Sequence, residues 1–486
     1  MTGSKSMRPR DAGAGRKEGG PGMRAATIEP GVGNDGNAPA GDPFAPAFER
    51  LSDSAFSGEP GWLRSGRGAS IGHFSRLGFP TPKLEDWRFT NIGAIREVAP
   101  RLAEGPGDAA PGDVDVARIP GIGSNVVVFV DGFFSPRLSA RDASSGVRVE
   151  SLGACLEESV VRESLGQLAA SDAHPLVALN SALWRDGALV SFPAGRRVEE
   201  PVHLIFLSTG GGSVVPRVLV VAGRGSEGSV IERFHGIGPG AYWVNAVTEV
   251  SVGDGARIEH TKIQCDDERA FHTATVQSRL GRDSYFTSHS ISLGALIARN
   301  DINTVLAGHN STSDLNGLYV CRGAQLCDHH TIVDHAVANC GSHEFYHGIL
   351  DERSRGVFNG KIFVRKDAQK TDAKQTNRGL LLSESALIDT KPQLEIFADD
   401  VKCTHGATVG RLDNEALYYL RARGVGPKDA GRMLTHAFAG EIIQKVAFRP
   451  LREHVDNFVF DYLEGLPALR CGDRACLRIS TSCIRR

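Results

Sequence analysis

About two hundred consecutive residues, from 202 to 410, carry short runs of alternating or β-branched side chains, and no long stretch of helical periodicity interrupts them. Each run ends at Gly, Asn or Asp, as strands bounded by turns do. The clearest runs are 244–252, 257–264, 273–280, 285–293 and 302–306. So many short strands fit a sandwich, a barrel or a parallel β-helix. The lack of obvious two-residue hairpin turns between them favours the β-helix.

Both flanks of this β region carry helical signals, which fits a solenoid because its open ends need caps. Upstream, residues 151–168 have apolar side chains at helical spacing. Downstream, Asp413 can cap a helix over 414–423, Pro427 can start a second helix, and residues 451–463 predict a third. We therefore predict a mainly β protein with helical regions at both ends of its core.

The two ends of the chain differ in character from the rest. Residues 1–41 are rich in Gly, Pro and short side chains and cannot bury enough apolar area to fold. The C-terminal cysteines have spacings that match no common zinc module. The predicted segments are a disordered tail (1–41), a mixed, largely helical domain (42–200), the β-helix core (201–410), a helical domain (411–465) and a variable tail (466–486) that carries Cys471, Cys476 and Cys483.

Composition narrows the class of protein. Hydrophobic residues make up 41% and charged residues 23% of the 486 residues, which is ordinary for a soluble globular protein. A net charge of −2 gives no general attraction to nucleic acid or to an anionic membrane. No apolar run reaches the roughly 18 residues that a membrane span needs. The nine cysteines form no regular pairs, so we expect reduced thiols and a cytoplasmic protein. A plastid protein would require the N-terminal tail to be a transit peptide, which its acidic residues disfavour.

Residues 358–410 carry the most suggestive chemistry. Strands are expected at 361–365 and 393–410, and the run 366–378 between them is too hydrophilic to be core. Cys403 and His405 lie two residues apart, so on a strand they share a face. Thiolate and imidazole are both good iron ligands. The same face also carries apolar side chains, so a buried cysteine beside a hydrogen-bonded histidine would equally fit it.

The motifs in this part of the chain resemble those of a known family. They are AQKTDAKQTNRGLLLSESA, KPQLEIFADDVKCTHGATVG and ALYYLRARGV, which begin at residues 368, 391 and 416. They are similar to the SufB/SufD family of the SUF iron–sulfur cluster assembly system, and to its SufD branch more than to its SufB branch. The SufB branch usually has a different, cysteine-bearing end to this strand. The resemblance extends over about residues 80–463.

The resemblance implies a right-handed parallel β-helix and a non-enzymatic scaffold subunit. Such a subunit pairs with a SufB-like subunit as a heterodimer, supports iron acquisition, and helps to form a nascent iron–sulfur cluster at their interface. A transient cluster, or iron shared with SufB, is the implied cargo, and the part played by a flavin stays open. His405 falls on the functional histidine of the family, and Cys403 is the second candidate ligand. A SufC-like ABC ATPase is expected to bind the C-terminal helices, where Met433, Leu434 and Phe438 form part of an apolar stripe.

Other readings of the sequence compete with this one. A SufB-like paralogue is the alternative within the family, and a β-helix carbohydrate-active enzyme is the alternative from another class. Residues 343–347 spell HExxH, but on a strand His343 and His347 lie about 13 Å apart, too far to share one zinc. The stretch 356–362 is one residue short of a P-loop and lacks Ser or Thr after Lys361, so no ATP site is expected.

Overall fold

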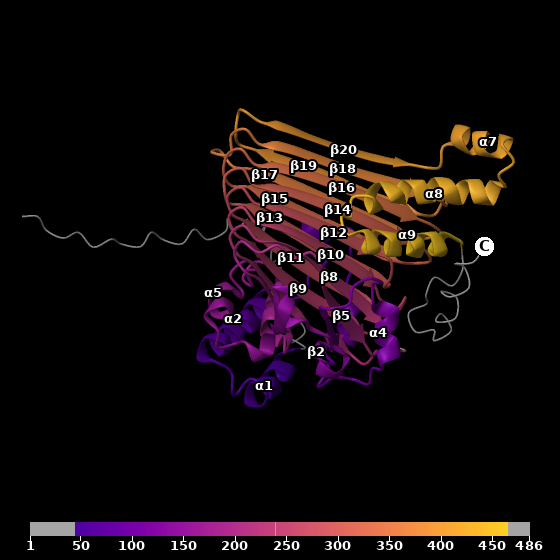
Figure 1. The fold of residues 1–486 in the computed structure, drawn as a ribbon. Helices are drawn as coiled ribbons and strands as arrows, with labels where there is room; N and C mark the ends of the chain where they lie inside the picture. Colours follow the sequence, from indigo (N-terminus) through magenta and orange to yellow (C-terminus); the bar gives the residue numbers. More distant parts are fainter. Residues whose placement is uncertain (1–43, 239, 465–486) are drawn as a thin grey trace, which may run out of the picture.

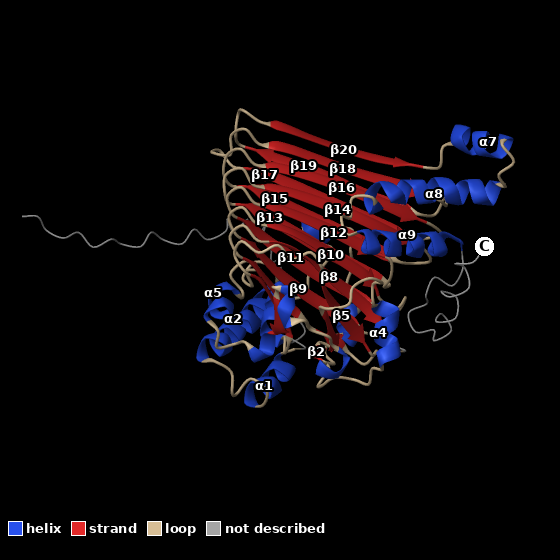
Figure 2. Ribbon diagram, viewed as in Figure 1, coloured by secondary structure: helices blue, strands red, loops and turns tan. Residues whose placement is uncertain are grey.

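The computed structural model describes residues 44–238 and 240–464, which form a parallel β-solenoid with helices at both ends (Figures 1 and 2). Two ten-stranded sheets make up the solenoid. From β7 to β20, successive strands alternate between the two sheets, so each turn gives one strand to each sheet. All neighbouring strands run parallel except the pairs β1–β2 and β3–β4.

The strands have the following bounds. The first sheet holds, in spatial order, β2 Phe133–Phe134, β1 Val126–Val130, β5 Val202–Ser208, β8 Glu227–Gly236, β10 Arg257–Cys265, β12 Tyr285–Ser292, β14 Thr312–Cys321, β16 Gly341–Leu350, β18 Asp372–Leu381 and β20 Lys402–Gly410. The second sheet holds β19 Leu387–Ile396, β17 Arg355–Val364, β15 Leu326–His335, β13 Ile297–Leu306, β11 Phe271–Leu280, β9 Trp243–Val252, β7 Arg217–Ala222, β4 Gly187–Phe192 and β3 Arg148–Ser151, with β6 Ser213–Val214 beside β9.

Helices lie at the base of the solenoid and along one side of its upper half (Figure 1). Those before the main run of strands are α1 Ala45–Asp53, α2 Gly61–Leu77, α3 Ile95–Val98, α4 Pro111–Ala117, α5 Ser159–Ser164 and α6 Pro175–Leu183, with 3-10 turns at Glu85–Trp87, Pro136–Leu138, Ala143–Ser145 and Leu152–Ala154. Those after it are α7 Asn414–Ala422, α8 Pro427–Ile443 and α9 Arg449–Glu464. None of the helices in the described ranges is both long and apolar enough to cross a membrane.

Successive turns stack in register, which places equivalent side chains in columns. β14, β16 and β18 begin at residues 312, 341 and 372, so these turns are 29 and 31 residues long. Sharp corners are needed at this spacing, and Asp283, Asn310 and Asn339 adopt positive φ at corners of the coil. Asp and Asn tolerate that left-handed conformation better than most side chains do.

The interior of the solenoid is apolar near the base and holds both apolar and polar side chains higher up. Near the base, the rings of Phe129, Phe206 and Phe234 stack on successive turns at centroid distances of 5.0 and 4.8 Å. Higher up, Lys262 is buried and donates to Asn300 Oδ1 at 2.6 Å, and burial lowers its pKa to about 8. A buried polar group needs such a partner to offset its lost hydration. The upper interior can therefore hold polar side chains in fixed positions.

The structure confirms the predicted fold class and corrects three sequence-based assignments. The helix expected over 151–168 is limited to α5, because β3 and a 3-10 turn occupy its first residues. The single strand expected over 393–410 is two strands in different sheets, β19 and β20, joined by a corner at 397–401. The polar run 366–378 contains the start of β18, whose Gln375 and Asn377 are buried inside the solenoid.

The predicted domain boundaries stay predictions. Both sheets begin before residue 201, because β1 pairs with β5 and β4 pairs with β7. The expected start of α7, with Asp413 accepting from the Glu415 amide, and the start of α8 at Pro427 are confirmed. The tails at 1–41 and 466–486, with Cys471, Cys476 and Cys483, lie outside the described residues.

Candidate functional site

The last turn of the solenoid, formed by β19 and β20, is open at its upper end (Figure 1). Within the described residues, β19 and β20 are the last strands of their sheets. Ile396 on β19 is 39% exposed, whereas Val364, its register partner one turn below, is 0% exposed. Val409 on β20 faces the interior and is 43% exposed. These side chains have the orientation of core residues, but no further turn of the described chain covers them.

Cys403 and His405 both lie on this open turn. They project from the inner face of β20, with Ala373 and Gln375 as their register partners on β18. Cys403 is half-buried and packs with Val401 and Leu394 in a small apolar cluster. His405 is exposed. The strand therefore presents an imidazole to the space above the solenoid and keeps the neighbouring thiol partly covered.

The chemistry of these two groups favours His405 as a metal ligand. A neutral imidazole can bind iron directly, whereas a thiol must first lose its proton. Burial raises the pKa of the Cys403 thiol, which makes its thiolate less available. Two donors are fewer than the four ligands that most clusters require. No group of three or more His, Cys, Asp or Glu side chains suited to a metal occurs in the described part of the chain. A complete site at His405 would need ligands beyond these two side chains.

A buried polar group lies beneath His405 that sequence reasoning missed. Gln375 on β18 and Glu344 on β16 occupy the same column as His405, one and two turns below it. The Glu344 carboxylate accepts from Thr331 Oγ1 at 2.5 Å and from Gln375 Nε2 at 3.2 Å. Burial raises the pKa of Glu344 to about 7. The sequence did carry a signal for a strand here, because Ala373, Gln375 and Asn377 recur at every second position. The polarity of the surrounding residues obscured this pattern.

The raised pKa of Glu344 predicts a particular pH dependence of stability. The unfolded chain loses this proton near pH 4.5, whereas the folded chain keeps it until about pH 7. The contribution of Glu344 to the free energy of unfolding is therefore greatest below pH 4.5. It falls by roughly 3 kcal/mol as the pH rises to about 7. Glu344→Gln should remove this loss and be more stable than the wild type at pH 8. Denaturant unfolding at pH 5 and pH 8 measures the difference.

The exposed Glu384 provides the matched control for this prediction. Glu384→Gln should leave the pH dependence of unfolding unchanged. If Glu344→Gln and the wild type lose the same stability between pH 5 and pH 8, Glu344 is ionised in the folded protein and the prediction is wrong.

The C-terminal helices contain the predicted partner-binding residues. Met433 on α8 is 52% exposed, and Leu434 is half-buried. Phe438 stacks on the His347 ring of β16 at a centroid distance of 4.4 Å and packs against the outer face of the first sheet. Tyr418 and Tyr419 on α7, 74% and 56% exposed, were not singled out from the sequence. Two adjacent tyrosines in the motif ALYYLRARGV were the sequence feature that could have indicated an exposed binding surface.

The HExxH residues lie on β16, as the strand prediction required. His343 Nδ1 contacts Asp314 Oδ1 at 2.9 Å, while His347 Nδ1 bonds to the Phe438 carbonyl at 3.0 Å, so the two imidazoles have separate partners. His343 and Asp314 line a hollow of about 340 Å³ with Tyr285, whose hydroxyl donates to the same carboxylate. Burial alone would raise the pKa of Asp314, but the hydrogen bonds from His343 and Tyr285 outweigh it and lower the pKa.

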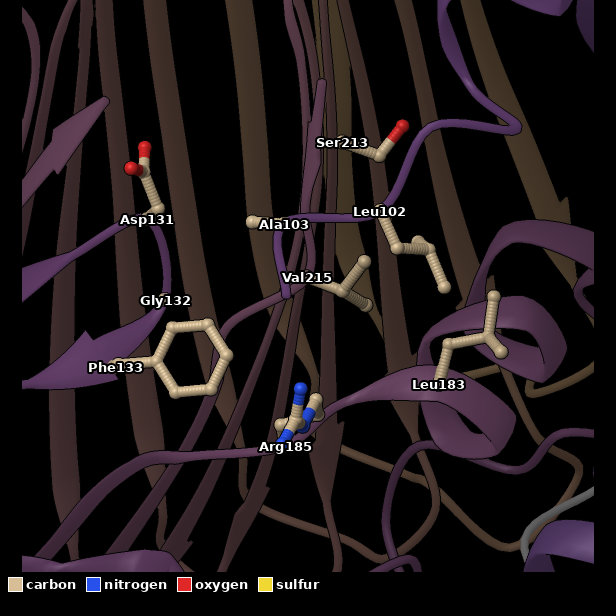
Figure 3. A pocket seen from close by; sticks show the side chains of 9 residues that line it. All are labelled: Leu102, Ala103, Asp131, Gly132, Phe133, Leu183, Arg185, Ser213 and Val215. Carbon is tan, nitrogen blue, oxygen red and sulfur yellow. The ribbon is translucent and has the colours of Figure 1, made fainter. Parts of the chain in front are cut away.

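A second, much smaller cavity lies at the base of the solenoid (Figure 3). Its volume is about 20 Å³, which is room for one water. The charged groups there are already engaged, since Arg185 donates to the Glu104 carbonyl at 2.8 Å and Asp131 accepts from the Thr209 amide at 2.8 Å. The residues in Figure 3 are Leu102, Ala103, Asp131, Gly132, Phe133, Leu183, Arg185, Ser213 and Val215. This cavity lies where several segments of the fold meet. At about 20 Å³ it is too small for a ligand larger than water.

Comparison with known proteins places these features in a family. The family model described as "SUF system FeS cluster assembly, SufBD core domain" matches residues 205–438, and that of the SufBD protein N-terminal region matches residues 43–204. The chain is 33% identical to the iron–sulfur cluster assembly protein SufD of Escherichia coli over 78% of this chain and 88% of that protein.

Two further relatives extend the comparison. Identity to SufD of Bacillus subtilis is 27%, over 82% of this chain and 94% of that protein. Identity to the chloroplastic protein ABCI7 of Arabidopsis thaliana is 28%, over 86% of this chain and 90% of that protein. Together with the matched core and N-terminal regions, these relatives show that the chain belongs to the SufB/SufD family of iron–sulfur cluster assembly proteins.

Proposed function

We propose that this chain is the SufD-like, non-enzymatic scaffold subunit of a SUF complex, which presents His405 as one ligand of a nascent iron–sulfur cluster shared with a SufB-like subunit. The observation that carries the proposal is the open last turn of the solenoid, where His405 lies on β20 and the outer edges of β19 and β20 have no neighbouring strand among the described residues. The cluster is cargo, and this chain supplies an imidazole and a rigid platform. The remaining ligands come from the partner.

The open turn has the properties of a surface that a second solenoid covers. Uncovered strand edges are normally blocked or paired, because they invite association. Leu387, at the start of β19, and Phe397, in the corner directly after β19, are large apolar side chains and are both exposed. Pairing edge to edge with a SufB-like β-helix would cover them, add backbone hydrogen bonds and bring the partner's ligands to His405.

Co-expression tests the proposal as a whole. The full chain should co-purify with SufB-like and SufC-like subunits from its own organism, and the purified complex should form a cluster when supplied with iron and sulfide under anaerobic conditions. A carbohydrate-active enzyme with this fold would bring neither subunit. A SufB-like identity would be favoured instead if the chain formed clusters without a SufB-like partner.

The exposed aromatics of α7 predict where the SufC-like ATPase binds. Truncation of a well-packed interface anchor typically costs more than 2 kcal/mol of binding free energy. We expect Tyr418→Ala with Met433→Ala to weaken ATPase binding by more than about 30-fold, because both side chains are exposed and neither supports the sheet. Isothermal titration with the purified ATPase gives the affinity.

Two variants act as controls for this interface. Phe460→Ala on α9 removes an exposed aromatic from a different helix and should leave ATPase affinity unchanged. Phe438→Ala should lower the melting temperature as well as affinity, because Phe438 packs on His347. If the double variant Tyr418→Ala with Met433→Ala binds the ATPase with unchanged affinity, the ATPase binds another surface of this chain.

A further inference from the structure

Gln375 lies directly below His405 in the register of the first sheet. β18 and β20 are neighbours, Gln375 and His405 are register partners, and both side chains are on the inner face. In-register residues on neighbouring strands are about 4.8 Å apart, which is within reach of two long side chains. Gln375 is 1% exposed, whereas His405 is exposed. The buried amide therefore lies on the strand directly below the one that carries the imidazole.

Glu344 and Thr331 determine which way that amide points. Thr331 Oγ1 and Gln375 Nε2 both donate to Glu344 Oε2, at 2.5 and 3.2 Å. Above about pH 7, where Glu344 is ionised, the amide can offer this carboxylate only its NH₂ group, so the amide oxygen must face elsewhere. Gly360 gives the amide its space, since a Cβ at that position would come within 2.2 Å of Gln375 Nε2.

The amide oxygen fixed in this way has no partner. Gln375 Oε1 is buried and accepts no hydrogen bond from any residue in the described ranges. A buried acceptor without a donor is unfavourable, so a donor near it is expected. The imidazole on the next strand can supply one N–H. Histidines that bind metals usually donate their second ring nitrogen to such an oxygen, which fixes the tautomer.

We propose that Gln375 is a positioning residue for His405: its amide oxygen accepts the N–H of one imidazole nitrogen, and the other nitrogen keeps its lone pair for iron at the open turn. Glu344 and Thr331 hold the amide in this orientation. The inference rests on the proposed role of His405. It adds that one tautomer is selected from inside the solenoid before any partner or iron arrives.

Asn377 offers a matched control on the same strand. It is as deeply buried as Gln375, lies on the same face, and its Oδ1 likewise has no partner among the described residues. The residue above it is Ala407, which has no group to orient. A change at Asn377 therefore disturbs the packing without affecting an imidazole.

The first measurement uses the full chain alone, labelled with ¹⁵N-histidine. The His405 signals are assigned by their absence in His405→Ala and recorded at pH 8, where an ordinary imidazole is neutral. In the wild type we expect the widely separated ¹⁵N shifts of a single tautomer. Gln375→Leu should move them toward the averaged values of an exposed histidine, and Asn377→Leu should leave them unchanged. The exchange variant Gln375→Glu with Glu344→Gln keeps one amide, one carboxylate and an acceptor, and should restore the single tautomer.

The second measurement uses the assembled complex and the iron concentration needed for half-maximal cluster formation. Gln375→Leu should raise it by about 10- to 100-fold, and Asn377→Leu, which also loses a buried side-chain hydrogen bond, should leave it unchanged. Averaged His405 shifts in the wild type, or shifts that Gln375→Leu leaves unchanged, would overturn the role of Gln375. Failure of the proposed function would give a different result, because His405→Ala would then assemble clusters normally. The ¹⁵N shifts of the chain alone would still show whether Gln375 selects the His405 tautomer.

Discussion

His405→Ala is expected to leave a stable complex that cannot build clusters. The side chain is exposed on the last strand, so its removal should cost no more than the one hydrogen bond proposed to Gln375, about 1 kcal/mol of the free energy of unfolding. Cluster yield should fall by more than about tenfold, because loss of a ligand costs at least as much as loss of a group that merely orients one. The measurements are complex formation, melting temperature and cluster absorbance after anaerobic supply of iron and sulfide.

Two neighbouring variants separate ligation from general damage to β20. Thr404→Ala changes an exposed residue on the opposite face of the same strand and should behave as the wild type. Cys403→Ser should have a smaller effect than His405→Ala, since burial raises the pKa of this thiol. If the His405→Ala complex is normally stable and gives the wild-type cluster yield, His405 is not a cluster ligand. Loss of the complex itself would make the histidine structural.

Val409→Asp is expected to abolish pairing with the SufB-like subunit. Val409 faces the interior but is exposed at the open turn, so the separate chain can keep an aspartate there in water. Pairing would bury the carboxylate without a partner, which costs several kcal/mol and weakens association by more than about 100-fold. Sedimentation of the purified subunits measures the association, and circular dichroism checks that the fold is retained.

Thr408→Asp is the matched control, because it places the same charge one residue away on the outer face of β20. It should alter pairing much less than Val409→Asp. Equal effects of the two variants would show that charge near the edge is sufficient, and unimpaired pairing by Val409→Asp would place the SufB-like subunit elsewhere on the solenoid.

The regular parts of the fold were predictable because their patterns are local. Alternation over runs such as 244–252 reflects one face toward the solenoid interior and one toward the outside, even where helices cover the outside. Asp413 and Pro427 mark helix starts through backbone chemistry. The polar strand β18 was missed because Gln375 and Asn377 are buried among polar partners, which a reading based on hydrophobicity does not expect. The corner at 397–401 was missed because it carries no glycine or proline.

The candidate site was predictable in its residue types and not in its surroundings. The spacing of Cys403 and His405 gives a shared face on any strand. That this face is uncovered depends on β19 and β20 being the last strands of their sheets, which is a property of the whole solenoid. Likewise, the position of Gln375 beneath His405 comes from a register between strands about 30 residues apart in sequence. Contacts of this kind leave no periodic signal along the chain.

Pulsed electron paramagnetic resonance of the cluster in the assembled complex tests the ligand role of His405 most directly. Only this chain is labelled with ¹⁵N-histidine, and the cluster is reduced to a paramagnetic state. Ligation by His405 predicts a strong nitrogen coupling that changes from a ¹⁴N to a ¹⁵N pattern on labelling and disappears in His405→Cys, which retains a ligand without a nitrogen. A spectrum that labelling of this chain does not alter, from a complex with a fully formed cluster, would contradict it.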